Sequence, residues 1–500
     1  MAQLTIQQAF EQAIEHHRAG RLQQAEHLYR QVLALQPQHA GALNQLGAIA
    51  THVGRFDLAV DFLRRALAVR PDYADAHCNL GIAFNCQGRL DEAIAEYRQA
   101  ISLKPDFAGA INNLGNALKY NRQLADAIAA YNQAIALNPA LAEPHNNLGN
   151  ALREGGQLTE AIASYHQAIS LRPNYAEAHN NLGIALKRLG RFDESIAAYS
   201  KAIALKPNYA EPHNNLGNTL QDQGQLDQAI ASYRQAIALK PNYAEAYNNL
   251  GNALQEKGQL DEGIAAFRQA IALRPDFAEA FTNLSNAMKD RGQLDESVAA
   301  CRQAIALLPD FVEAHSNLIF TLHYHPEYDA QAIAQELDRW NRQHAQPLRK
   351  FIQPHTNDRS PDRPLRIGYV SPDFRNHPVG RNLLPWFHLH DRNQFDITCY
   401  AHVLRPDALT RQLQPIAGAW RDIVGLSDRQ VADQIRQDRI DILVDLAVHT
   451  AFSRLLVFAH KPAPVQVSYL GYAGSTGMTS IDYRLSDPYL DPPGLDESCY

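Results

Sequence analysis

The first 310 residues repeat one pattern of apolar and polar positions with a period of 34 residues. Proline recurs at this period nine times, from Pro37 to Pro309. A typical unit has a Leu-Gly pair (Leu182-Gly183), a glycine in mid-unit (Gly190), an aromatic residue (Tyr199) and then the closing proline. The mid-unit glycine suits the left-handed residue after a first helix, and the proline ends a second one. Each unit is therefore predicted to be a helical hairpin.

One hairpin cannot bury its apolar face alone, so the units are expected to stack into a solenoid. The spacing matches the tetratricopeptide repeat, and we expect nine repeats over residues 6–311, forming an α-solenoid superhelix. An aspartate three residues after the mid-unit glycine is expected to cap the second helix. These aspartates are Asp91, Asp193, Asp227, Asp261 and Asp295.

A row of asparagines precedes the repeated leucine. Side-chain amides offer donors and an acceptor, so such a row is able to bind an extended peptide backbone without reading its sequence. The alternative is that the asparagines only cap or solvate the surface between repeats, and the spacing alone does not choose between the two. The candidate peptide-binding residues are Asn113, Asn147, Asn181, Asn215, Asn249 and Asn283.

The repeat pattern fails after Phe311. Residues 312–345 are predicted to hold a partial repeat, with a first helix over residues 316–325, and a capping helix over residues 330–344 that contains Trp340. Residues 346–362, rich in proline and charge, are predicted to be a linker. From residue 363 onward, short apolar runs alternate with helix-like stretches, which predicts a parallel, Rossmann-like α/β sheet. The expected strands are Leu365–Val370, Phe395–Ala401, Ile440–Val448, Val465–Leu470 and Ile481–Leu485; the clearest helix is Ser427–Asp438, with Ser427 as its cap.

Ligands of such sheets bind beyond the carboxyl ends of the strands. His377, His449 and the loop from Gly471 to Gly477 follow the first, third and fourth predicted strands, so they are expected on one rim. A histidine there suits a general base, and a flexible glycine loop suits phosphate or sugar hydroxyls. The alternative for His449 is that it satisfies a backbone group at a strand end. A metal site from Asp373, His377 and His449 is not favoured by the spacing, and no metal is predicted.

Composition excludes several classes of protein. The net charge of −7 argues against a general nucleic-acid binder. Five scattered cysteines favour a reducing compartment, and neither a signal peptide nor an apolar run of membrane-spanning length is present. We therefore expect a cytoplasmic protein without nucleic-acid or membrane partners. Its oligomeric state is not fixed by the sequence, and a homodimer is one alternative.

The segments LRIGYVSPDFRNHPVG, RIDILVDLAVHT and KPAPVQVSYLGYAGSTGMTSIDYRLSD after a long repeat array resemble glycosyltransferase family 41, which includes O-GlcNAc and SPINDLY-type transferases. The resemblance implies a GT-B fold and inverting, metal-independent transfer of GlcNAc from UDP-GlcNAc to Ser or Thr of proteins recruited by the repeats, with no other cofactor. It implies that His377 and, less directly, His449 are catalytic and that the concave-face asparagines hold the acceptor. The expected donor-binding residues are Gly471, Gly474, Ser475 and Thr476.

A GT-B enzyme needs a second Rossmann-like half, which holds most of the nucleotide-binding residues. Residues 363–500 correspond only to the N-terminal part of such a catalytic region, so we expect the chain to be a fragment of a longer protein. Two alternatives remain: a repeat scaffold with a non-catalytic α/β segment, and a family relative that uses fucose or glucose. The sequence does not reveal the acceptor proteins.

Overall fold

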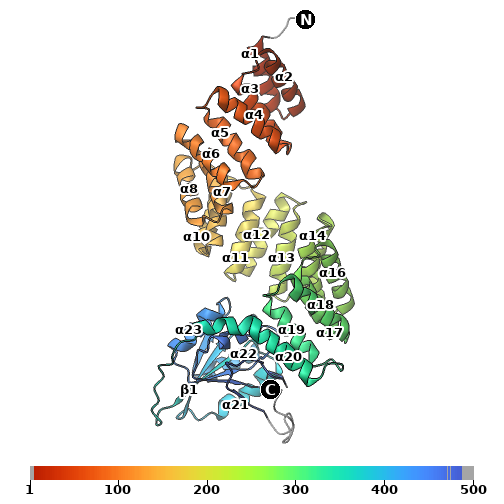
Figure 1. The fold of residues 1–500 in the computed structure, drawn as a ribbon, viewed down its shortest axis with the longest axis vertical. Coiled ribbons are helices and arrows are strands. Elements are labelled where there is room, and N and C mark those ends of the chain that lie inside the picture. Colours follow the sequence, from red (N-terminus) through yellow and green to blue (C-terminus); the bar gives the residue numbers. More distant parts are fainter. Residues whose placement is uncertain (1–4, 470, 473, 487–500) are drawn as a thin grey trace. The chain divides into compact units, whose positions relative to one another are not determined.

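The computed structural model describes residues 5–469, 471–472 and 474–486. The chain forms two compact units, residues 1–219 and 220–500. The first unit consists of paired antiparallel helices that follow one another along the chain (Figure 1). They are α1 (Ile6–Arg18), α2 (Leu22–Leu35), α3 (Ala40–His52), α4 (Phe56–Val69), α5 (Ala74–Cys86), α6 (Leu90–Leu103), α7 (Ala108–Tyr120), α8 (Leu124–Leu137), α9 (Ala142–Glu154), α10 (Leu158–Leu171), α11 (Ala176–Arg188) and α12 (Phe192–Leu205), with α13 (Ala210–Asp222) at the boundary.

The glycine of the Leu-Gly pair lets the two helices of a repeat approach closely. In α7, a Cβ atom on Gly115 would lie 2.6 Å from the ring of Tyr131 on α8. Tyr131 is itself fully buried. The aromatic residue therefore fills the space that the missing side chain leaves, as the repeat pattern predicts.

The turn between the two helices also follows the pattern, except for the expected cap. Gly190 has a φ of +72°, and where the glycine is replaced, Arg122 takes the same left-handed conformation with a φ of 59°. The expectation that the aspartates cap the second helix is wrong. In α6, the N-cap is Arg89, without a side-chain cap bond, and Asp91 lies in the first turn. The same holds for the other four aspartates. The helix begins at the preceding leucine, so these carboxylates act through the helix dipole.

The second unit continues the repeats and ends in an α/β domain. Its helices are α14 (Leu226–Leu239), α15 (Ala244–Glu256), α16 (Leu260–Leu273), α17 (Ala278–Asp290), α18 (Leu294–Leu307), α19 (Val312–Leu322) and α20 (Ala330–Trp340). Helix α19 begins four residues before the predicted first helix. The capping helix is α-helical only to Trp340 and continues as a π-helix over Asn341–Ala345. A short 3-10 helix, Gln346–Phe351, follows. The predicted linker then joins the α/β domain through Asn357, whose Nδ2 donates to Asp441 Oδ1 at 2.7 Å.

The sheet is parallel throughout and has the strand order β3-β2-β1-β4-β5-β6. The predicted strands are present, although the third is shorter, the last has two residues, and Leu470 lies outside the described residues. The strand β3 was not predicted. Ser427 caps α23 through a capping box, as predicted. The bounds are β1 (Leu365–Ser371), β2 (Phe395–Ala401), β3 (Ala419–Asp422), β4 (Ile442–Asp445), β5 (Val465–Ser468) and β6 (Tyr483–Arg484), with α21 (Pro378–Leu389), α22 (Ala408–Ile416), α23 (Asp428–Gln437) and α24 (Leu455–Ala459).

Each face of the sheet has its own apolar core. On one face, Leu383 of α21 and Leu413 of α22 pack with Val444. On the other face, α23 and α24 pack with Ile319 of α19 and with Leu337 and Trp340 of α20. Helices α19 and α20 together form the last repeat. Helices α19 and α20 are therefore part of the core of the α/β domain as well as the end of the repeats.

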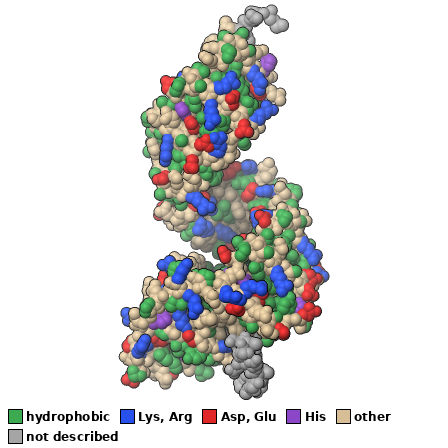
Figure 2. All heavy atoms as spheres, viewed as in Figure 1, with side chains coloured by type: hydrophobic (Ala, Val, Ile, Leu, Met, Phe, Trp, Pro, Cys, Tyr) green, Lys and Arg blue, Asp and Glu red, His purple; other side chains and the backbone are tan. Residues whose placement is uncertain are grey.

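The surface carries interspersed charges of both signs on the face that Figure 2 shows. Ion pairs link consecutive repeats, as between Arg274 and Glu245 at 2.6 Å. Such exposed pairs contribute about 0–1 kcal/mol each. Among the helices of the described residues, none combines the length and the apolar character that a membrane span requires.

Candidate functional site

The sheet order brings the three expected loops together. Strands β1, β4 and β5 are consecutive neighbours and parallel, so the loops that follow them emerge at the same edge. His377 lies in the first loop, His449 in the second and the glycine loop in the third. The predicted common rim is therefore present, but the two histidines lie in very different surroundings.

His377 is partly exposed and caps α21. Its side chain is 39% exposed, and Nδ1 lies 3.4 Å from the backbone nitrogen of Val379 and 3.5 Å from Oδ2 of Asp373. Only one of these contacts is made at a time, because Nδ1 must be unprotonated to accept from Val379 and protonated to donate to Asp373. When Nδ1 donates to the nearly buried Asp373, Nε2 is unprotonated, which is the tautomer a general base needs.

The loop that carries His377 is held rigidly by its neighbours. A Cβ atom on Gly380 would lie 2.3 Å from the carbonyl oxygen of Arg375, so only glycine allows the loop to fold over the start of α21. The backbone nitrogen of Asn376 donates to Asp407, the N-cap residue of α22, at 2.6 Å. Burial acts to raise the pKa of Asp407, but N–H donors from Thr410 and Asn376 hold it below its ordinary value.

His449 is fully buried. Its Nδ1 lies 3.3 Å from Oγ of Ser316, and its Nε2 lies 3.0 Å from the carbonyl oxygen of Thr476. Burial lowers the pKa of His449 to about 3, and the hydrogen bond to Thr476 only partly opposes this. Both nitrogens are thus engaged inside the protein. This geometry supports the alternative in which His449 satisfies a backbone group, and it offers no nitrogen to a substrate.

The described glycines of the glycine loop lie close to neighbouring elements. A Cβ atom on Gly471 would lie 2.6 Å from Val448, and one on Gly474 would lie 2.8 Å from Nε2 of His323, the C-cap residue of α19. Gly477 has a φ of +65°, and its Cβ would lie 2.7 Å from Leu337 on α20. These glycines therefore allow a close approach to the last repeat and to the loop after β4.

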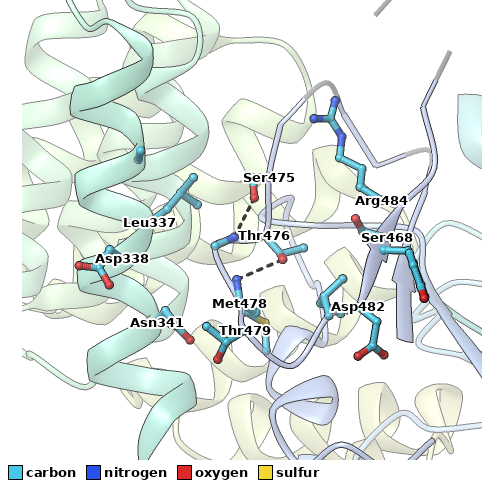
Figure 3. A pocket seen from close by; sticks show the side chains of 14 residues that line it. Leu337, Asp338, Asn341, Ser468, Ser475, Thr476, Met478, Thr479, Asp482 and Arg484 are labelled. Atoms are coloured by element: carbon cyan, nitrogen blue, oxygen red, sulfur yellow. Dashed lines mark hydrogen bonds between the residues drawn. The ribbon is translucent and has the colours of Figure 1, made fainter. Parts of the chain in front are cut away.

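A cavity of about 450 Å³ lies between α20 and this loop (Figure 3). Of the expected donor-binding residues, Ser475 and Thr476 line it, whereas Gly471 and Gly474 do not. The hydroxyl of Ser475 accepts from the backbone of Gly477 at 3.1 Å, and that of Thr476 accepts from Met478 at 3.3 Å. Asp338 and Asn341 also line the cavity. No sequence signal marked them, because they belong to the capping helix and the π-helical turn after it.

The Asp373, His377 and His449 set does not form a metal site. His377 faces Asp373, whereas His449 faces Ser316 and Thr476. Within the part of the chain that the structure describes, no three His, Cys, Asp or Glu residues come together as metal ligands.

The asparagine row bonds one repeat to the next. Asn181 donates from Nδ2 to Oδ1 of Asn146 at 3.0 Å, and Asn215 donates to Asn180 at the same distance. Asn147 and Asn283 make the corresponding bonds to Asn112 and Asn248, and Asn113 bonds to the thiol of Cys78. Asn249 also has a partner. The acceptor asparagines are buried, and the recurring Asn-Asn doublet was their signal. Each bond uses one of the two N–H groups, so it does not decide whether the row also binds a peptide.

Comparison with known proteins shows which families the segments of this chain match. The family model for glycosyl transferase family 41 matches residues 306–498, and tetratricopeptide repeat models match segments between residues 38 and 308. Among solved structures, that of an O-GlcNAc transferase mutant from Thermobaculum terrenum is similar to this chain, with 36% sequence identity and a TM-score of 0.54. That similarity covers 58% of this chain and 55% of the other.

Two curated plant proteins are also similar. The probable UDP-N-acetylglucosamine–peptide N-acetylglucosaminyltransferase SPINDLY of Solanum lycopersicum is 40% identical over 145 residues, which are 28% of this chain and 16% of that protein. The corresponding SEC protein of Arabidopsis thaliana is 41% identical over 129 residues, or 26% and 13% of the two chains. The chain thus matches less than a fifth of the length of these relatives. Residues 306–498 thus match the family model for glycosyl transferase family 41, they follow segments that match tetratricopeptide repeat models, and the chain is similar to transferases of the SPINDLY and SEC type.

Proposed function

We propose that the chain is the repeat arm and the acceptor-side catalytic region of a protein O-glycosyltransferase. The reaction transfers GlcNAc from UDP-GlcNAc to a Ser or Thr hydroxyl of a protein recruited by the repeats. The observation that carries the proposal is the partly exposed imidazole of His377, set against Asp373 on the strand rim of a family 41 segment.

In this proposal, His377 is the general base. The acceptor hydroxyl oxygen attacks the anomeric carbon of the donor while Nε2 of His377 accepts the hydroxyl proton. The bond from the anomeric carbon to the diphosphate breaks, UDP leaves, and the configuration inverts without a metal. Asp373 holds the Nδ1 proton and stabilises the imidazolium that forms.

The donor assignment has separate support. The names of the two plant relatives specify UDP-N-acetylglucosamine. The cavity beside Ser475 and Thr476 offers hydroxyls and backbone groups of the kind that bind a sugar. A GT-B enzyme binds its nucleotide mainly with a second Rossmann-like half, so GDP-fucose and UDP-glucose are the competing donors.

The acceptor is a protein held along the concave face of the repeats. The asparagine row supports this, because the bond to the preceding repeat occupies one N–H group of the amide in Asn147, Asn181, Asn215 and Asn283. We place the reaction in the cytoplasm, in agreement with the free thiols of Cys78, Cys86, Cys301 and Cys399.

The test is transfer by the protein expressed from its complete reading frame. It is incubated with cell-extract proteins and one radiolabelled donor at a time: UDP-GlcNAc, GDP-fucose or UDP-glucose. We expect label from UDP-GlcNAc on Ser and Thr. Label from only one of the other donors would overturn the donor assignment. An absence of label from all three donors would contradict the enzyme proposal and favour the scaffold.

A further inference from the structure

A directional chain of hydrogen bonds runs through His449. The indole nitrogen of Trp340 donates to Oγ of Ser316 at 3.1 Å. Because a carbonyl only accepts, Nε2 of His449 donates to the carbonyl of Thr476. Burial lowers the pKa of His449, so the imidazole is neutral and its proton lies on Nε2. Its unprotonated Nδ1 then accepts from the Ser316 hydroxyl.

The turn before His449 is built for this orientation. Val448, a β-branched residue, has a φ of 53°, a left-handed conformation that such residues rarely adopt. The buried carboxylate of Asp445 accepts from the backbone nitrogens of Val448 at 2.8 Å and Ala447 at 3.3 Å, which holds the turn. Strained backbone that persists at the end of a strand is typical of sites where a side chain must be aimed.

On the other side, His449 meets the end of the repeats. Ser316 stands in the last repeat at the place that Asn248 and Thr282 hold in the two before it, and all three are buried. Nearby, His315 lies 2.8 Å from Glu336 and 3.0 Å from His344, which ties α19 to α20 and the turn beyond it. The ring of Trp340 contacts His449 edge-on, with centroids 4.9 Å apart.

We propose that His449 is a positioning residue that fixes the loop after β5 to the last repeat through Thr476 and Ser316. It thereby holds Ser475 and Thr476 in place for the donor. The role of the loop in donor binding rests on the proposed function. The hydrogen-bonded link between the last repeat and the loop does not. The last repeat then sets the geometry of the donor side, and a displacement of α19 or α20 is transmitted to this loop.

The primary experiment is hydrogen–deuterium exchange on this chain, which needs no enzymatic activity. The variants are Ser316→Ala, Ser316→Thr and His449→Phe, with Ser170→Ala as the matched control. Ser170 is an exposed serine whose hydroxyl donates to the backbone carbonyl of Gln167 in its own helix. We expect about tenfold faster exchange over residues 474–480 in Ser316→Ala and His449→Phe, since one hydrogen bond shifts a local equilibrium by up to this factor. Ser316→Thr retains the hydroxyl and should restore protection, and β1 should be unchanged in all variants.

A loop that exchanges as in the wild type in folded Ser316→Ala would overturn the proposal. If His449→Phe loses protection everywhere, the Ser316→Ala and Ser316→Thr pair decides the question. In the active full-length enzyme, Ser316→Ala should raise KM for the donor several-fold at an unchanged KM for the acceptor. An unchanged donor KM would leave only a structural role and also overturn the proposal. A wild type without transfer activity would instead refute the proposed function, while the exchange result would still stand.

Discussion

The hydroxyl oxygen of Ser316 lies 3.3 Å from Nδ1 of His449, although 133 residues separate the two in sequence. The contact joins the last repeat to the carboxyl end of β4. It explains why the α/β sheet shares a core with α19 and α20, and why the end of the repeats should not be treated as a separable arm. The same junction has a measurable dependence on pH.

Acid should weaken this junction. Burial, with a smaller contribution from His315, lowers the pKa of His344 to about 4. In the unfolded chain the pKa is about 6.5. The unfolded state therefore binds more protons between these values, so stability is complete above pH 6.5 and falls as the pH drops toward 4. From pH 7 to pH 5, the free energy of unfolding should fall by about 2 kcal/mol through His344 alone.

Urea unfolding of the second unit at pH 7 and pH 5 measures this effect. The variant His344→Gln cannot gain the proton and should lose less stability on acidification than the wild type. Equal losses in both proteins would mean that His344 does not remain neutral in the folded state.

The repeat glycines should respond oppositely to alanine within a single helix. In α7, Gly115→Ala places a methyl group 2.6 Å from the ring of Tyr131, so we expect a loss of about 1–3 kcal/mol. Gly109 is exposed in the same helix, and its Cβ would approach Phe107 only to 3.7 Å. Gly109→Ala should therefore be neutral or stabilise by about 0.5–1 kcal/mol. Thermal unfolding monitored by circular dichroism compares the two, and similar losses would refute the packing explanation.

Two neighbouring asparagines separate the structural and binding roles of the row. Asn146 is buried and accepts from the half-buried Asn181. Asn146→Ala and Asn181→Ala should each cost about 1 kcal/mol of stability, because each breaks the same hydrogen bond. Only Asn181→Ala should also weaken capture of an acceptor protein. Denaturant unfolding and acceptor binding are measured on the same preparations. Equal binding by the two variants would make the row purely structural.

The repeats were predictable because they depend on local periodicity, and the common rim was predictable because loops that follow parallel strands emerge at one edge of the sheet. Glycine and proline at fixed offsets specify where helices end. The burial of the Tyr131 ring between two helices requires only that Gly115 has no Cβ atom. The helix cap was mispredicted because Asp91 follows a leucine that already takes a helical conformation. The strand β3 was missed because four residues, two of them charged, give little apolar signal.

The surroundings of His449 were not predictable from local pattern. Its burial depends on Trp340 and Ser316, which reach it from the last repeat through tertiary packing. The same applies to the glycine loop, where Gly474 and Gly477 make room for His323 and Leu337. His377 was correctly expected on the common rim because its loop follows β1, a strand of the parallel sheet.

The central claim is that His377 is the base of a protein O-glycosyltransferase. The most direct measurement is the initial rate of GlcNAc transfer from UDP-GlcNAc by the full-length His377→Ala variant. His388→Ala, which removes an exposed histidine from the same helix α21, serves as the control. We predict a loss of about 10²–10⁴-fold for His377→Ala and a rate close to wild type for His388→Ala. Undiminished transfer by folded His377→Ala would contradict the account.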